Sequence, residues 1–118
     1  MQKFYRQGDV AIIGISKRKD GQYIPVTRLV MAEGEVTGHA HVVIPDTLAD
    51  SIGFEEVNEW RTDPESGLRY FCRGFMRITG TASAVHEDHV PPIPLESRDF
   101  EIRIQSEYNP IEYRKVVD

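Results

Sequence analysis

The chain has 118 residues, a formal net charge of −5 and a single cysteine, Cys72. One cysteine excludes an intrachain disulfide and the paired-thiolate zinc motifs, and acidic residues interspersed with basic ones argue against nucleic-acid binding. No apolar stretch approaches the roughly 20 residues that span a bilayer, so we expect a cytoplasmic protein without a membrane segment. The length predicts one domain over residues 1–118, without linker or repeat.

The first half of the chain alternates short apolar runs with turn residues, which is typical of an antiparallel all-β domain. Residues 10–15 are apolar at nearly every position and predict a central strand covered on both faces. We expect this strand to turn at residues 20–21 into a partner over residues 23–32, with the basic run 17–19 at a solvated tip. Pro25 lacks an N–H and therefore predicts a sheet edge or a bulge.

The second half continues this pattern with one exception. Residues 46–52 favour a short helix with an N-cap aspartate. After a turn at residues 63–67, residues 68–78 predict one long bent strand or two short strands broken at Gly74. Residues 100–105 alternate strictly and predict a strand with one apolar face and one wet face. We therefore expect an all-β fold with minor helix: seven to nine strands in a single-domain antiparallel β-barrel or β-sandwich.

All four histidines lie in two clusters, His39-Ala40-His41 and His86-Glu87-Asp88-His89, separated by 44 residues. Imidazole is the commonest transition-metal ligand, so we interpret the clusters as two ligand-bearing segments that the fold brings together. On a strand, His39 and His41 would point to one face and reach one ion. We expect His86 and His89 in a loop after a strand ending near residue 85, because the prolines that follow prevent a helix.

The number of bound histidines decides what such a site does. Four imidazoles would close the coordination shell around a structural ion, whereas three would leave a position for water or substrate. Imidazole coordination favours a divalent transition metal, and we expect zinc or iron. Glu35 and Glu87 are the candidate catalytic residues, as proton-transfer groups beside the ion.

Two other interpretations of the histidines stay open. They could be unrelated surface side chains hydrogen-bonded to their neighbours, or a metal-free acid–base site. His86-Glu87-Asp88-His89 is not the H-E-x-x-H metalloprotease signature, in which the histidines lie four residues apart on a helix.

The H-x-H of His39 and His41, on a predicted strand and followed by a later histidine, resembles the cupin family. In that family a β-barrel of two facing sheets holds a metal through H-x-H, a glutamate and a third histidine. The resemblance implies His39 and His41 as the first ligands and His86 or His89 as the third. The family's glutamate and its P-x-G motif have no counterpart at the usual places.

Longer strings are similar to a group of small uncharacterised bacterial and phage proteins. They are Gln7-Gly8-Asp9-Val10, the run from Glu33 to His41, Val85 to His89, and Gln105 to Pro110. This resemblance implies kinship over nearly the whole chain and no particular chemistry.

Three classes of function follow. The first is a metal-dependent hydrolase or oxygenase that acts on a small molecule. The second is a non-enzymatic interaction module with a structural metal, in which residues 91–94 or the tail 108–118 contact a partner. The third is a metal-free barrel whose histidines bind a small-molecule ligand. The tail could also be exchanged with a second subunit, which would make a homo-oligomer.

Overall fold

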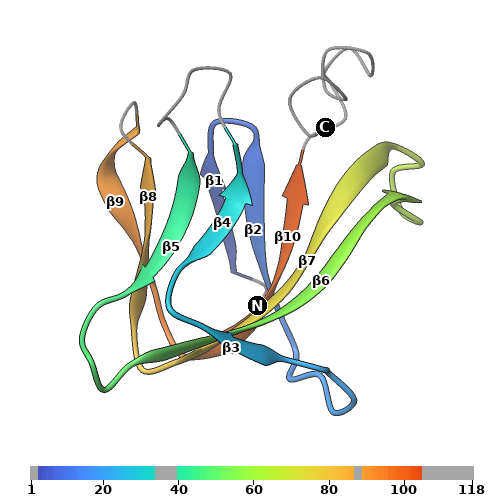
Figure 1. The fold of residues 1–118 in the computed structure, drawn as a ribbon. Helices are drawn as coiled ribbons and strands as arrows, with labels where there is room; N and C mark the ends of the chain where they lie inside the picture. The colour runs from blue at the N-terminus through green and yellow to red at the C-terminus, as the bar shows by residue number, and fades with distance from the viewer. Residues whose placement is uncertain (1–2, 34–39, 87–88, 105–118) are drawn as a thin grey trace.

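Two antiparallel β-sheets face each other in the computed structural model, which describes residues 3–33, 40–86 and 89–104 (Figure 1). The described residues form ten strands and no helix, so none of them makes a helix that could cross a membrane. The expected all-β sandwich is confirmed. The alternative of a closed barrel is wrong, since the strands form two separate sheets, and the expected seven to nine strands were too few.

The larger sheet has six strands in the order β1-β2-β10-β7-β6-β3. Their bounds are Phe4–Gln7 (β1), Val10–Ile15 (β2), Ile24–Val26 (β3), Ser51–Thr62 (β6), Arg69–Thr79 (β7) and Arg98–Ile104 (β10). The smaller sheet has the order β4-β5-β8-β9. Its strands are Leu29–Ala32 (β4), His41–Pro45 (β5), Ala82–His86 (β8) and His89–Leu95 (β9).

The hydrophobic core lies between the two sheets, because each strand turns alternate side chains inward. Phe100 and Ile102 on β10 are fully buried and belong to one core cluster with apolar side chains of the smaller sheet, such as Met31 and Val43. The other buried members of this cluster are Val10, Ile12, Leu29, Ile52, Phe54, Met76, Ile78, Ala82, Ala84 and Leu95.

The strand over residues 10–15 is central and buried as predicted, but its predicted hairpin partner is wrong. β2 pairs with β1 on one side and with β10 on the other, so no edge remains for residues 23–32. That segment divides instead: β3 pairs with β6, and β4 pairs with β5 in the smaller sheet. Because β3 is an edge strand, the expectation for Pro25 is confirmed.

The predicted helix over residues 46–52 is also wrong. The Asp50 carboxylate accepts hydrogen bonds from the Thr47 N–H and hydroxyl, which closes a turn in place of a helix. Leu48 is fully exposed, and Ile52 is buried as the second residue of β6. Cross-strand burial of Ile52 therefore outweighs the local helical preference.

The long bent strand predicted over residues 68–78 is confirmed as β7. A turn precedes it, in which Asp63 accepts hydrogen bonds from the backbone of Glu65 and Ser66. Gly74 has φ +155°, and an added Cβ would strike the carbonyl oxygen of Glu55. The ladder with β10 shifts register beside Gly74, and the shift bends the strand.

The second face of β10 is not wet, contrary to expectation. Asp99, on that face, is 3% exposed and forms a paired ion bridge with Arg77, at 2.8 and 3.0 Å. It also accepts hydrogen bonds from the Arg18 N–H and the Tyr23 hydroxyl. Farther along the strand, Glu101 is buried beside Arg103 and accepts a hydrogen bond from Tyr70. Long basic and aromatic side chains thus cover the polar face.

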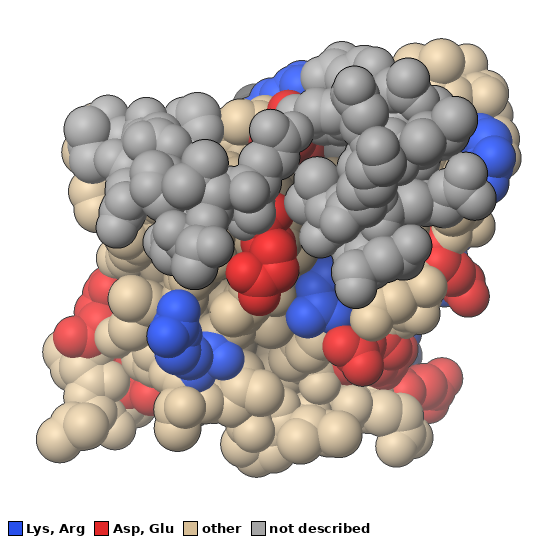
Figure 2. Space-filling model, turned by 45° about the horizontal axis from the view of Figure 1, so that its top comes forward, with Lys and Arg blue, Asp and Glu red and all other residues tan. Residues whose placement is uncertain are grey.

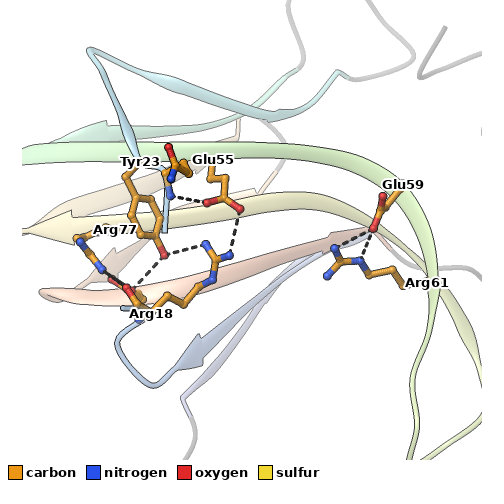
Figure 3. Close-up of polar contacts among 8 residues, drawn as sticks. Arg18, Tyr23, Glu55, Glu59, Arg61 and Arg77 are labelled. Carbon is orange, nitrogen blue, oxygen red and sulfur yellow. Dashed lines mark hydrogen bonds and ion pairs between the residues drawn. The ribbon is translucent and has the colours of Figure 1, made fainter. Parts of the chain in front are cut away.

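Arg18 explains why the basic run 17–19 is not a simple solvated tip. Lys17 and Lys19 are exposed as expected, but the Arg18 guanidinium lies 3.8 Å from the centre of the Phe75 ring. It also pairs with Glu55 at 3.0 Å (Figure 3). The segment between β2 and β3 therefore packs against the outer face of the larger sheet.

Replacing Phe100 with alanine tests the core. Phe100→Ala should lower the free energy of unfolding by about 3 to 5 kcal/mol, because it leaves a cavity between the sheets. Phe4→Ala is the matched control, since Phe4 is 58% exposed. Urea denaturation measures both, and equal losses would contradict the assigned core.

Asp99→Asn tests the outer-face network. Burial alone would raise the pKa of Asp99, but hydrogen bonds from Arg77, Arg18 and Tyr23 outweigh it and hold the pKa below its usual value. Asp99 therefore stabilises the fold above its unfolded pKa of about 3.9, and this contribution is lost as pH falls through the lower folded pKa. We expect Asp99→Asn to cost about 2 kcal/mol at pH 7 and much less at the acid end of the folded range.

Urea denaturation across this pH range measures the effect of Asp99→Asn. The control is Glu65→Gln in the exposed turn before β7, which should change little at any pH. A loss at pH 7 that did not shrink in acid would show that the ionised carboxylate is not the stabilising group.

Candidate functional site

One histidine from each cluster lies at the same end of the sandwich. β5 begins at His41 and β8 ends at His86, and both of these strand ends lie at the top of Figure 1. The two strands pair antiparallel with Val42 opposite Val85, so the histidines are cross-strand neighbours. Their rings are stacked, with centroids 4.1 Å apart and planes inclined by 26°. The fold thus brings together two imidazoles that are far apart in the chain.

Both imidazoles face the space between the sheets. His41 shares the inner face of β5 with Val43, and His86 shares that of β8 with Ala84, because side chains alternate along a strand. The exposed fractions are 7% for His41 and 6% for His86. The pair therefore caps one end of the apolar core.

Gln7 reaches the pair from the opposite sheet. It is the last residue of β1, and it is buried, with an exposed fraction of 2%. Its Oε1 lies 3.0 Å from Nδ1 of His41, and its Nε2 donates to the backbone carbonyl of Ala84 at 3.3 Å. One carboxamide thus connects the larger sheet to two strands of the smaller one.

The remaining candidate residues are not placed in the same way. His39, Glu35 and Glu87 lie outside the described residues. His89 begins β9, and its backbone pairs with that of His86, but its side chain is outside the described part. A strand does end near residue 85, as expected, but the expected loop position of His86 and His89 is wrong. His86 is the last residue of β8, and His89 is the first residue of β9, because the two strands pair up to these positions.

Two imidazoles are a suitable but incomplete set of metal ligands. Neutral nitrogen donors suit zinc, copper, nickel or iron. Within residues 3–33, 40–86 and 89–104, no three side chains of His, Cys, Asp or Glu lie close enough together to hold an ion. A third ligand of these four residue types would therefore come from side chains that the structure does not describe.

Cys72 does not offer a thiolate. It is fully buried on β7, where burial and the nearby charge of Glu101 raise the thiol pKa to about 11. The thiol stays protonated at neutral pH, and protonated thiols are poor ligands and nucleophiles.

Gln7 is the site residue that the histidine pattern did not reveal. Its position on the strand is one signal of burial. Gln7 lies two residues after Tyr5 and therefore on the same face of β1, and Tyr5 packs against the core. A polar residue at an inward position needs a partner. Its second partner, the carbonyl of Ala84, has no signature in the sequence.

Surface charge is mixed on the face that Figure 2 shows, where acidic and basic side chains of the described residues are interspersed. The ion pairs of the larger sheet, such as Arg61 with Glu59 and Arg73 with Glu56, follow the same pattern. Basic side chains in such pairs are already neutralised by carboxylates.

Comparison with known proteins gives one result. No curated protein matches the chain, and no solved structure does. A family model described as "Domain of unknown function (DUF8820)" matches residues 6–105, a segment that includes Gln7, His41 and His86. Because this match covers most of the sequence, the chain belongs to the DUF8820 family.

Proposed function

We propose that this protein binds one divalent transition metal ion at the histidine end of the sandwich. The observation that carries the proposal is the stacked pair of His41 and His86, which come from clusters 44 residues apart and meet at 4.1 Å. Unrelated surface histidines are usually at least partly exposed and are not expected to stack against each other. A buried imidazole pair at the end of two strands is suited to ligate an ion.

Further ligands are expected from His39 or His89. His39 lies two residues before His41 in the sequence, and His89 pairs through its backbone with His86, so these two histidines are the further ligands that we propose. Zinc and iron are the metals we expect, because imidazole nitrogen is a ligand that both accept. The ring planes are stacked and inclined by only 26°, so lone pairs that lie in these planes do not converge on one nearby ion, and binding requires at least one ring to turn.

Catalysis requires an open coordination position. With three histidine ligands, a bound ion would activate water or dioxygen in a hydrolase or oxygenase that takes a small molecule, as the resemblance to cupins implies. Glu35 and Glu87 are the proton-transfer groups in this proposal, because each lies within a few residues of a proposed ligand.

A non-enzymatic role is the second candidate, favoured by the contact between the sheets. Gln7 joins β1 to His41 on β5 and to Ala84 on β8, so the imidazoles already take part in holding the sheets together. In this alternative the ion is structural, and the exposed prolines of β9 contact a partner.

Metal content of single variants tests the proposal. Protein purified without added metal should contain about one equivalent of zinc or iron, and His41→Ala and His86→Ala should each lose it. Each variant removes a ligand itself. Its zinc affinity should therefore fall by more than the roughly 10- to 100-fold that is typical when only a hydrogen-bond partner of a ligand is removed. Elemental analysis and calorimetric titration with zinc measure both effects.

Ser83→Ala is the matched control for this experiment. Ser83 lies on the same strand as His86 but on its outer face, where its hydroxyl donates to Asp46. It should keep the ion. Wild-type protein that binds neither metal, or unchanged binding by both histidine variants, would refute the proposal. His39→Ala and His89→Ala then show which further histidine contributes.

Chelation separates the two candidate roles. Metal-free protein should keep its β-sheet circular dichroism, because the core between the sheets consists of apolar side chains. A structural zinc can contribute roughly 10 to 16 kcal/mol, comparable to the stability of a whole domain, so its removal would unfold the chain. Loss of the β-sheet signal on chelation would therefore favour the structural role over the enzymatic one.

A further inference from the structure

The carboxamide of Gln7 is oriented by a partner that only accepts hydrogen bonds. Its nitrogen donates to the carbonyl oxygen of Ala84 at 3.3 Å, and its oxygen lies 3.0 Å from Nδ1 of His41. The reverse orientation would set two oxygens against each other at Ala84. The backbone of β8 therefore decides which end of the amide faces the imidazole.

This orientation fixes the proton of His41. The Gln7 oxygen carries no hydrogen, so Nδ1 must supply the one between them. A neutral imidazole has a single N–H, which places the lone pair on Nε2. We propose that Gln7 is a positioning residue that holds His41 as the Nδ1–H tautomer and so presents Nε2 for ligation. The consequence for ligation rests on the proposed metal function, whereas the assignment of the tautomer does not.

Burial strengthens this effect. Gln7 and His41 are 2% and 7% exposed, so water does not readily replace either partner. Gln7 also contacts both histidine-bearing strands at once, since Ala84 lies two residues before His86 on β8 and pairs with Val43 of β5. Outer hydrogen bonds of this kind set the ring orientation and basicity of ligating histidines.

The test is the 15N spectrum of the histidine side chains in metal-free protein, at about pH 8, above the usual histidine pKa of about 6.5. In the wild type, His41 should show a protonated Nδ1 and an unprotonated Nε2. Gln7→Leu removes the acceptor and should shift the proton toward Nε2. If Gln7→Leu does not fold, Gln7→Met removes the same oxygen from an unbranched chain. A wild-type Nε2–H form, or an unchanged Nδ1–H form in the folded variant, would overturn the inference.

One further variant separates positioning from packing. Tyr5→Phe is the matched control. Tyr5 lies on the same face of β1 as Gln7, but its hydroxyl donates to Glu96 and not to a histidine. It should leave the His41 spectrum unchanged. A change in Tyr5→Phe equal to that in Gln7→Leu would show that general packing on β1 sets the tautomer.

Zinc titration of the same proteins completes the experiment. Gln7→Leu should bind zinc about 10- to 100-fold more weakly than the wild type. If the spectra behave as expected but the wild type binds no zinc, the proposed function fails and the positioning role of Gln7 stands. If the wild type binds zinc but the His41 tautomer is the same in Gln7→Leu, the positioning role of Gln7 is refuted and the proposed metal binding is not.

Discussion

The register between β5 and β8 is the constraint on which the candidate site depends. Val42 lies opposite Val85, so His41 and His86 occupy neighbouring positions on one inner face. Because side chains alternate with a period of two, a shift by one residue would send one ring inward and the other outward. The same shift would turn out either Val43 or Ala84, whichever lies on the shifted strand, although both are fully buried. Packing of the apolar core therefore also brings the imidazoles together.

Buried polar side chains differ in kind between the space inside the sandwich and the outer face of the larger sheet. Among the described residues five polar side chains are buried, namely Gln7, His41, His86, Asp99 and Glu101. The three that lack a carboxylate meet between the sheets, where an unpaired charge would be costly. The two carboxylates lie on the outer face of β10, where arginines neutralise them. The space between the sheets thus accepts amide and imidazole groups that satisfy one another, and this combination suits a buried ligand site.

Local pattern predicted β2 from its continuous apolar run, β10 from its alternation and β7 as a bent strand. It failed where a distant segment decides the outcome. The face of β10 that carries Asp99 reads as solvent-exposed, yet Arg77 from β7 and Arg18 from a loop cover it. Residues 23–32 read as a hairpin partner for β2, yet β10, from the other end of the chain, pairs with that edge. Long-range pairing leaves no mark in the local sequence.

The sequence was enough to predict an all-β fold, an edge or a bulge at Pro25, a bend or a break at Gly74 and the two histidine clusters, because alternation, ring geometry and residue chemistry are local properties. The contact between the clusters through His41 and His86, and the position of Gln7 against them, became visible in the packed sheets alone. These contacts depend on the register of β5 with β8 and on the packing of β1 against the smaller sheet. Burial of apolar side chains throughout the domain selects both.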